Sequence, residues 1–229
     1  MEFERASLAT CGTASGIVVA IDVLRAFSTA AYAFGAGAQS ILLTGSVEEA
    51  LALKQRFPHA LLMGEVNGLP IPGFDFGNSP TLIARQDLHA RQLIQRTSAG
   101  TQGIVRSQNA GLLLASSLCC AGATAKWIRW HAAQHACLTF VITGQRPPAW
   151  GDEDAACADY IEALLKGQQP DTAAIIQRVR SSPAGQVFMN EDEPDFPASD
   201  LEHCLAIDRF DFAMQVEKRD GLMVMKPVL

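Results

Sequence analysis

Short strand-like runs that alternate with helical segments constrain the fold of this chain more than any other feature. The runs lie at residues 17–21, 40–44, 60–63, 92–96, 111–116 and 137–142. Helices are predicted at 28–34, 46–57, 121–134, 152–165 and 171–179, and a β-hairpin at 212–225. This alternation predicts an α/β fold with a mixed, largely buried sheet covered by helices. Because the alternation runs through two rounds, two similar halves are left open.

Size and charge exclude several classes of protein. The chain has 229 residues, 48% of them hydrophobic, and a net charge of −6. This favours one globular domain over residues 1–229, with a subdivision near 80–90 left open. The acidic balance argues against nucleic-acid and anionic-membrane partners, and no apolar run reaches the roughly 18 residues of a membrane span. Without a basic leader at the N-terminus, we expect a cytoplasmic protein, with a homo-oligomer left open.

The cysteines and histidines form no metal motif. The six cysteines contain no C-x-x-C pair, so free thiols in a reducing compartment are expected. His131 and His135 have the four-residue spacing of some zinc sites, but the accompanying glutamate is absent. A solvated helix face is therefore expected there.

Polar clusters follow the predicted strands. They lie at residues 22–29, 73–80, 96–103 and 151–158. Open α/β sheets bind ligands at the carboxyl ends of their strands, so we expect these clusters to form one site.

The segment 73–80, Gly-Phe-Asp-Phe-Gly-Asn-Ser-Pro, is the most informative of the clusters. Its glycines allow a ligand to approach the backbone closely. Ser79 as N-cap and Pro80 as first helical residue would direct free N–H groups at an anion, with Asn78 beside them. A plain Gly/Pro turn is the alternative.

Asp22 ends a strand-like run and opens a polar loop. Its carboxylate could bind a metal or attack phosphorus, whereas the alternative is a helix N-cap. Arg25 could grip phosphate with two hydrogen bonds, and Ser28 and Thr29 could donate from the start of a helix. A second aspartate two residues after Asp22, as aspartyl phosphatases require, is absent, because that residue is Leu24.

Oxygen ligands are the common feature of the remaining candidates. Carboxylates suit Mg²⁺, which keeps several waters and binds one or two acids together with a substrate phosphate. The expected metal ligands are Asp22, Glu65, Asp75 and Asp154, with catalytic roles for Asp22, Arg25 and Asp75. The expected phosphate or substrate contacts are Ser28, Thr29, Asn78, Ser79, Thr97, Gly100, Thr101 and Arg146.

Four ordered motifs resemble the 2-phosphosulfolactate phosphatase family, over about residues 16–165. They are D-V-L-R-A-x-S-T at 22–29, G-E-x-x-G at 64–68, G-F-D-x-G-N-S-P at 73–80 and E-D-x-x-C-A at 153–158. The resemblance implies an α/β fold, hydrolysis of a phosphate monoester and a divalent cation. The family usually has arginines at the positions of Val66 and Gln102, so a weakened preference for the sulfonated substrate is expected.

These observations favour a magnesium-dependent phosphatase acting on a small acidic phosphate monoester, 2-phosphosulfolactate or a related 2-phospho acid. The alternatives are a non-catalytic binder of a phosphorylated metabolite, or a lyase or isomerase that uses the same acids.

Overall fold

Ten strands form one mixed sheet in the computed structural model of this chain, which describes residues 1–131, 137–146, 149–190 and 192–229. The order across the sheet is β1-β8-β2-β7-β11-β12-β3-β6-β4-β5. Their bounds are β1 (Glu2–Ser7), β2 (Ile17–Ile21), β3 (Ser40–Thr44), β4 (Leu61–Val66), β5 (Leu69–Pro70), β6 (Gln92–Arg96), β7 (Leu112–Ser116), β8 (Cys137–Ile142), β11 (Ala213–Arg219) and β12 (Leu222–Val228). Two further short strands, β9 (Gln145–Arg146) and β10 (Ala149–Trp150), pair with each other.

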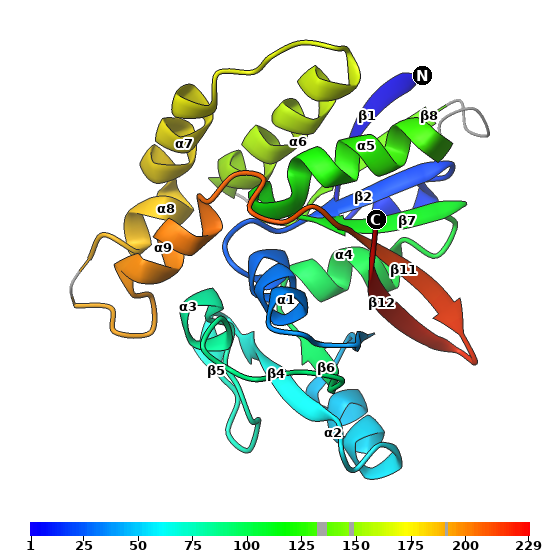
Figure 1. Ribbon diagram of the computed structural model, residues 1–229, viewed down its shortest axis with the longest axis vertical. Coiled ribbons are helices and arrows are strands. Elements are labelled where there is room, and N and C mark those ends of the chain that lie inside the picture. The colour runs from blue at the N-terminus through cyan, green and yellow to red at the C-terminus, as the bar shows by residue number, and fades with distance from the viewer. Residues whose placement is uncertain (132–136, 147–148, 191) are drawn as a thin grey trace.

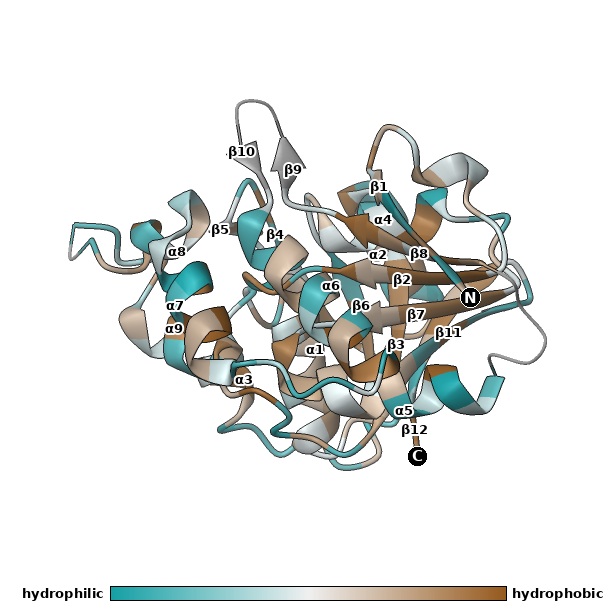
Figure 2. Ribbon diagram, turned by 90° about the horizontal axis from the view of Figure 1, so that it is seen from above, coloured by the Kyte–Doolittle hydropathy of each residue, from teal (hydrophilic) through white to brown (hydrophobic). Residues whose placement is uncertain are grey.

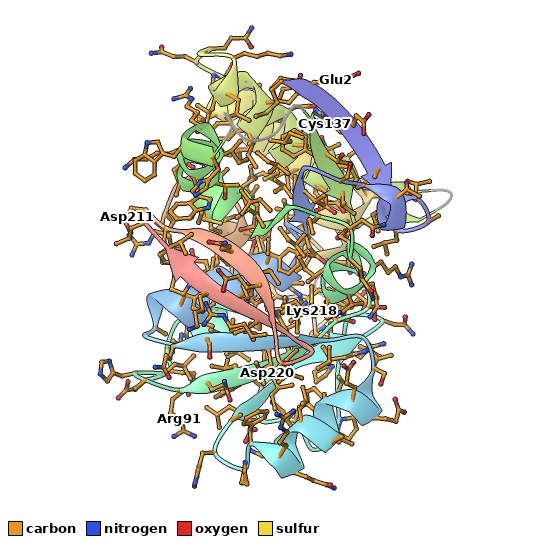
Figure 3. The ribbon with its side chains drawn as sticks, turned by 90° about the vertical axis from the view of Figure 1, so that its right-hand side faces the viewer. Glu2, Arg91, Cys137, Asp211, Lys218 and Asp220 are labelled. Carbon is orange, nitrogen blue, oxygen red and sulfur yellow. The ribbon has the colours of Figure 1, made fainter. Side chains whose placement is uncertain are left out.

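The sheet consists of two parallel blocks joined by an antiparallel hairpin. Strands β1, β8, β2 and β7 are parallel, as are β3, β6 and β4. The hairpin β11–β12 lies between the blocks and pairs antiparallel with β7 on one side and with β3 on the other. Figure 3 shows this hairpin within the sheet, with Lys218 and Asp220 near its tip. The two blocks therefore run in opposite directions.

Helices fill both faces of the sheet (Figure 1). Their bounds are α1 (Ala26–Gly35), α2 (Val47–Arg56), α3 (Pro80–Ile83), α4 (Gly100–Arg106), α5 (Ala121–His131), α6 (Asp152–Leu165), α7 (Thr172–Ser181), α8 (Pro183–Val187) and α9 (Ala198–Cys204). Helices α5 and α6 pack on the outer face of the first block, and α2 packs on the outer face of the second. The central strands β2 and β8 are correspondingly strongly apolar in Figure 2, whereas the edge strand β1 is hydrophilic.

Helix α1 lies at the centre of the molecule. Every residue from Ala26 to Phe34 is buried. Phe27 and Ile104 of α4 belong to one apolar cluster together with residues of both parallel blocks and of the hairpin. The sheet thus wraps around α1 and α4, and its twist turns the carboxyl ends of the two blocks toward one region.

The mixed α/β class and most of the predicted elements are confirmed. Strands β2, β3, β6 and β8 have the expected bounds, and the hairpin turns at Asp220-Gly221. Ser46 caps α2 by accepting a hydrogen bond from the Glu49 N–H, 3.1 Å away. The helix predicted for 121–134 is described only to His131, and His135 lies outside the described residues. Strands β1 and β5 and helices α4, α8 and α9 were not predicted.

The free-thiol prediction is also confirmed. All six cysteines are free, and five of them are buried. Within the described parts of the chain, no helix has the length and apolarity needed to cross a bilayer.

Leu114→Ala tests the importance of the central strand β7. Leu114 is fully buried, so its truncation should lower the free energy of unfolding by about 2–5 kcal/mol. Urea denaturation measures the change. Leu51→Ala is the control, because Leu51 is exposed on α2 and its loss should change stability by less than about 0.5 kcal/mol. Equal changes in the free energy of unfolding for the two variants would contradict the burial of Leu114 in the core.

Candidate functional site

An acidic cleft of about 300 Å³ lies where the carboxyl ends of the two parallel blocks come together. It is lined by Asp22, Leu24, Arg25, Glu65, Asn67, Gly68, Asn78, Ser98, Ala99, Gly144, Glu153, Asp154, Ala184 and Phe196. A larger hollow of about 610 Å³ lies between α2, β7 and the β11–β12 hairpin, and its lining includes none of the expected site residues. The cleft is therefore the candidate site.

Asp22 lies at the centre of this cleft. Its Oδ1 accepts a hydrogen bond of 2.9 Å from the Ala26 N–H at the start of α1. Its Oδ2 lies against Gly100, where an added Cβ would come within 2.9 Å of that oxygen. Asp22 is not the N-cap of α1, which is Arg25, but its Oδ1 accepts from the first N–H of the helix while its carboxylate also faces the cleft. Gly100 contributes by leaving room for this carboxylate.

Asp154 joins the ends of two strands. Its Oδ1 accepts a hydrogen bond from the Val23 N–H at 2.8 Å, and its Oδ2 accepts one from the Gly144 N–H at 2.7 Å. Thr143 Oγ1 lies 3.3 Å from the same Oδ2. Asp154 therefore lines the cleft in a fixed position, and most of its acceptor positions are used by the protein.

Glu153 is the least constrained of the acids. Its side chain lines the cleft at 6% exposure and makes no hydrogen bond to any other described residue. It comes from the first turn of α6, where the helix dipole favours a negative charge. The sequence analysis placed Glu153 in one of the four motifs but did not include it among the site residues.

Burial, with the charges of neighbouring acids, raises the pKa values of three of these acids. Burial is the main cause for Asp22, with the nearby Glu65 charge adding to it, and together they raise the pKa of Asp22 to about 6. Burial, followed by the Glu153 and Asp22 charges, raises the pKa of Asp154 well above its usual value. Burial and the Asp22 charge also raise the pKa of Glu153. A positive charge in the cleft would stabilise the ionised forms of all three.

Glu65 holds two loops of the cleft together. Its carboxylate accepts hydrogen bonds of 2.5 Å from the Gly68 and Ser98 N–H groups. Arg96 donates to the Glu65 carbonyl oxygen at 2.7 Å and so supports the same corner. Asn67 and Gly68 have positive φ angles of 53° and 85°, which suits the two-residue turn between β4 and β5. Glu65 thus lies in the cleft as expected, but much of its carboxylate is used to fix these loops.

Two other expected residues reach the cleft from loops. Arg25 lines it and is 5% exposed. Asn78 lines it too, and its Oδ1 is buried without a hydrogen-bond partner among the described residues. An unpaired buried amide oxygen is costly, so a ligand or water is expected to complete it.

Four hydroxyl residues were expected to contact substrate, and their placement makes that expectation wrong. Ser28, Thr29, Thr97 and Thr101 are fully buried and do not line the cleft. Ser28 donates to the Val23 carbonyl oxygen at 2.7 Å. Thr97 and Thr101 each accept a hydrogen bond from the N–H of the other, at 3.0 and 2.9 Å, and thereby cap α4. Three of these hydroxyl groups are thus used inside the protein, whereas Thr29 Oγ1 is buried without a hydrogen-bond partner among the described residues.

Asp75 does not join the other acids, so its expected place in the metal site is wrong. Its Oδ2 accepts a hydrogen bond of 2.8 Å from the Leu62 N–H and lies 3.7 Å from Lys54 Nζ. Leu62 is three residues before Glu65, about 10 Å along β4. The loop after β4 folds back so that Phe76 bridges to Met63, which carries Asp75 toward the beginning of the strand.

Ser79 and Arg146 complete the expected set. Ser79 caps α3 as predicted, but its Oγ donates to Asp200 at 2.6 Å, and the side chain lines a neighbouring hollow instead of the cleft. Arg146 belongs to β9, and its side chain lies outside the described part of the structure.

Two functional candidates lie beyond residue 180 and were missed. Phe196 forms one wall of the cleft and packs its ring against Gly68. Asp200 is fully buried and pairs with Arg25 at 2.8 Å. The sequence contains no local motif around either residue that would have identified them.

The donor set fits a hard divalent cation better than zinc. Among the described residues that line the cleft, the available ligands are carboxylate oxygens, and none is a cysteine or histidine. Across the described residues, however, no three Asp, Glu, His or Cys side chains converge closely enough to form a metal cluster by themselves. A cation that needs only one or two protein carboxylates matches both observations.

The fold and cleft define an α/β protein with a small, acidic, ligand-sized site at its strand ends. Comparison with known proteins identifies the family to which it belongs. A family model described as 2-phosphosulpholactate phosphatase matches residues 5–219, so the chain belongs to that family of phosphoric monoester hydrolases. The resemblance inferred from the four motifs is thereby confirmed.

Three relatives from different organisms match nearly the whole chain, and each carries the name probable 2-phosphosulfolactate phosphatase. One from Bacillus subtilis (strain 168) is 36% identical over 206 residues, which cover 90% of this chain and 88% of the relative. One from Carboxydothermus hydrogenoformans is 31% identical and covers 91% and 90%. One from Thermoplasma volcanium is 28% identical and covers 86% and 87%.

Glu153→Gln tests the cost of the Glu153 charge, which comes first from burial and then from repulsion by Asp22. The raised pKa means that ionising Glu153 costs more in the folded than in the unfolded state, so this cost grows as pH rises above the usual value of 4.5. The substitution removes the charge and breaks no hydrogen bond to another described residue. In chelator, the variant should therefore be more stable than wild type at pH 8, with a smaller difference at pH 5.

Urea unfolding at the two pH values measures this effect. Glu202→Gln is the control, because Glu202 is an exposed acid on α9 paired with Arg180. A Glu153→Gln protein that is destabilised equally at both pH values would contradict the repulsion.

Proposed function

We propose that this protein hydrolyses 2-phosphosulfolactate, or a closely related 2-phospho acid, with Mg²⁺ as its cofactor. Water supplies the oxygen that replaces the ester oxygen on phosphorus, so the products are inorganic phosphate and the 2-hydroxy acid, 3-sulfolactate for the sulfonated substrate. Membership of the phosphatase family and the names of the relatives support this substrate class.

The charge of the cleft is the observation that carries the proposal. Among the described residues, four carboxylates line it, those of Asp22, Glu65, Glu153 and Asp154, against the single guanidinium of Arg25. The charge of Arg25 is already balanced by Asp200. A phosphate monoester would be repelled from such a cleft unless a cation entered with it. A divalent cation bound by the acids removes this repulsion and creates a site for the phosphate.

Asp22 and Glu153 are the residues best placed to hold the cation. Both face the cleft, and Glu153 has no competing hydrogen bond to another described side chain or backbone group. Mg²⁺ typically takes one or two carboxylates, waters and a substrate phosphate, which matches this supply. When bound, Mg²⁺ would neutralise phosphate charge and stabilise the charge that develops during phosphoryl transfer.

The side chains of the cleft have separate roles in this proposal. Arg25 donates to an anionic group of the substrate, and the Asn78 amide completes its hydrogen bonding with the ligand. Asp22 lies in the cleft as a carboxylate that would hold the cation or, where it is not bound to the cation, accept a proton from an attacking water. Glu65 keeps the loops of Gly68 and Ser98 in place around the substrate. Direct attack by Asp22 on phosphorus is the alternative chemical step.

The two family positions that lack arginine bear on the choice of substrate. Gln102 donates to the carbonyl oxygens of Gly45 and Thr97, at 2.8 and 3.2 Å, and does not line the cleft. Arg106 donates to the Leu8 carbonyl oxygen and also lies outside the cleft lining. Arg106 therefore does not replace the missing arginines at the cleft, and a weakened preference for the sulfonate stays a prediction.

Phosphate release from a substrate panel tests the function. With Mg²⁺, the protein should hydrolyse 2-phosphosulfolactate, 2-phospholactate and phosphoglycolate to different extents, and excess chelator should abolish release. A 100-fold preference for the sulfonated compound would show that the missing arginines do not matter. Binding of these esters without any phosphate release would favour the non-catalytic alternative, whereas full activity in chelator would exclude the cation requirement.

Asp22→Asn and Asp75→Asn form a matched pair that tests the site itself. Both aspartates were expected to have the same role, but only Asp22 lies in the cleft. Asp22→Asn should lower kcat by at least about 100-fold, because acid–base groups contribute about 10²–10⁴-fold. Asp75→Asn should keep near-normal activity, since asparagine can still accept the hydrogen bond from Leu62. Steady-state kinetics on folded proteins decides, and the reverse ranking would refute this site.

A further inference from the structure

Arg25 is held in a fixed orientation by contacts from distant parts of the chain. Its Nη1 donates to the Asp200 carboxylate and to the Asp195 carbonyl oxygen, both at 2.8 Å. Its Nη2 donates to the Gly68 carbonyl oxygen at 3.1 Å. These partners lie 43 to 175 residues away in sequence. The position of the guanidinium is thus set by the tertiary structure.

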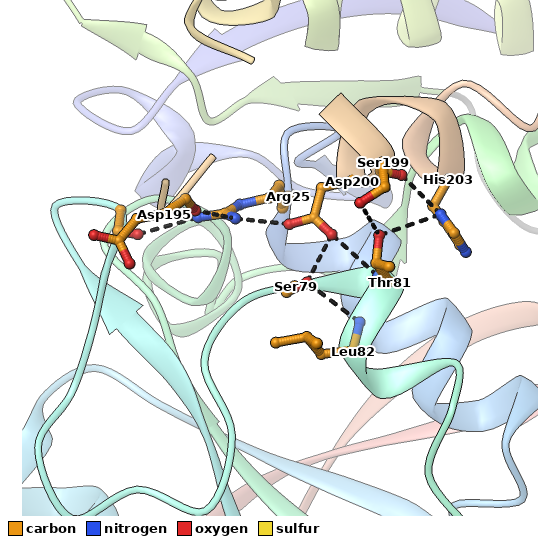
Figure 4. Close-up of polar contacts among 9 residues, drawn as sticks. Arg25, Ser79, Thr81, Leu82, Asp195, Ser199, Asp200 and His203 are labelled. Atoms are coloured by element: carbon orange, nitrogen blue, oxygen red, sulfur yellow. Dashed lines mark hydrogen bonds and ion pairs between the residues drawn. The ribbon is translucent and has the colours of Figure 1, made fainter. Parts of the chain in front are cut away.

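Asp200 is the centre of this arrangement (Figure 4). Its Oδ2 binds Arg25, while its Oδ1 accepts hydrogen bonds from Ser79 Oγ at 2.6 Å and from the Thr81 N–H at 3.1 Å. Asp200 is fully buried, and Arg25 is 5% exposed. An isolated buried carboxylate would be very costly, and these contacts offset that cost. They also fix the positions of both oxygens of Asp200.

Two aromatic rings confine the guanidinium as well. The centroids of the Phe196 and Phe188 rings lie 4.8 and 5.4 Å from Arg25 Cζ. Such cation–π contacts favour the charged group over the ring faces. Together with the hydrogen bonds, the rings leave the Arg25 side chain little rotational freedom.

The pattern of contacts does not use the whole guanidinium. An arginine has five N–H donors, and among the described residues three are used, by Asp200, Asp195 and Gly68. The Nε–H and one N–H of Nη2 remain. Arg25 lines both the cleft and the neighbouring hollow beside Ser79, and an anionic group in the cleft could use the donors that the protein leaves free.

We infer that Asp200 is a positioning residue for the phosphatase reaction: it holds Arg25 so that its two spare donors meet an anionic group of the substrate. The substrate in this inference comes from the proposed function. The contact between Asp200 and Arg25 is observed independently of that function. Asp200 has no place in the lining of the cleft and acts through Arg25. An arginine without this partner would have to be ordered by the substrate, which weakens binding and lowers the rate.

Asp200→Asn removes this control with little change in shape. The amide oxygen can still accept from Ser79 and Thr81, whereas the amide NH₂ would face the Nη1 donor of Arg25. We expect kcat/KM to fall at least tenfold and the inhibition constant of inorganic phosphate to rise. Glu202→Gln, on the same helix α9 but in an exposed pair with Arg180, should leave both values unchanged.

A double-variant cycle separates positioning from a merely structural role. In an Arg25→Ala background, Asp200→Asn should lower kcat/KM less than twofold further, since the residue it positions is gone. Ser79→Ala is a milder variant that removes one hydrogen bond to Asp200 and should give a smaller loss in the same direction. It serves if Asp200→Asn does not fold. Additive losses in the cycle, or a folded Asp200→Asn or Ser79→Ala protein with wild-type kinetics, would overturn the inference.

Calorimetric binding of inorganic phosphate, in the presence of Mg²⁺, tests the same contact without turnover. Wild type should bind phosphate at least several-fold more tightly than Asp200→Asn. If wild type releases no phosphate from any ester but shows this difference in binding, the proposed function fails and the positioning role stands. Equal binding by the two folded proteins, or no binding by wild type, would refute the positioning role.

Discussion

The burial of helix α1 on all sides is the constraint on which the rest of the structure depends. A helix without a solvent face must be enclosed by other elements, and here one sheet wraps around it from both parallel blocks. Asp22 and Arg25 lie just before this helix. Since α1 cannot shift without disrupting the core, these two residues are held in place by a helix that is buried from Ala26 to Phe34.

The buried carboxylates of the cleft lower the free energy of unfolding that the core provides. Burial raises the pKa values of Asp22, Glu153 and Asp154, and a neighbouring acid adds to each shift: Glu65 for Asp22, Asp22 for Glu153, and Glu153 with Asp22 for Asp154. Proteins tolerate such crowding of like charges mainly at functional sites. The same electrostatic cost that lowers stability without a cation increases the affinity for one, so the acids and the core have opposite roles in the free energy of folding.

Local patterns allowed much of the fold and part of the site to be predicted. Strand β2 was predictable because its sequence, Ile-Val-Val-Ala-Ile, is apolar throughout, as a fully buried strand requires. Asp22 was predictable because it follows that strand directly. Helix α4 was missed because its glycines disfavour helix, yet Gly103 is needed where an added Cβ would come within 2.8 Å of Thr143. Asp200 was missed because its partner Arg25 is 175 residues away. The position of Asp75 depends on how a loop folds back, which no local pattern reveals.

The hairpin β11–β12 gives the fold an order of assembly. Residues 213–228 separate the two parallel blocks, so the edges of β7 and β3 find their partners only when this late segment arrives. During synthesis on the ribosome, both blocks would present unpaired strand edges, which are prone to pair with other chains. Strands made after both blocks thus join the sheet, and correct assembly of the acidic cleft must wait for a segment that contributes none of the described residues of its lining.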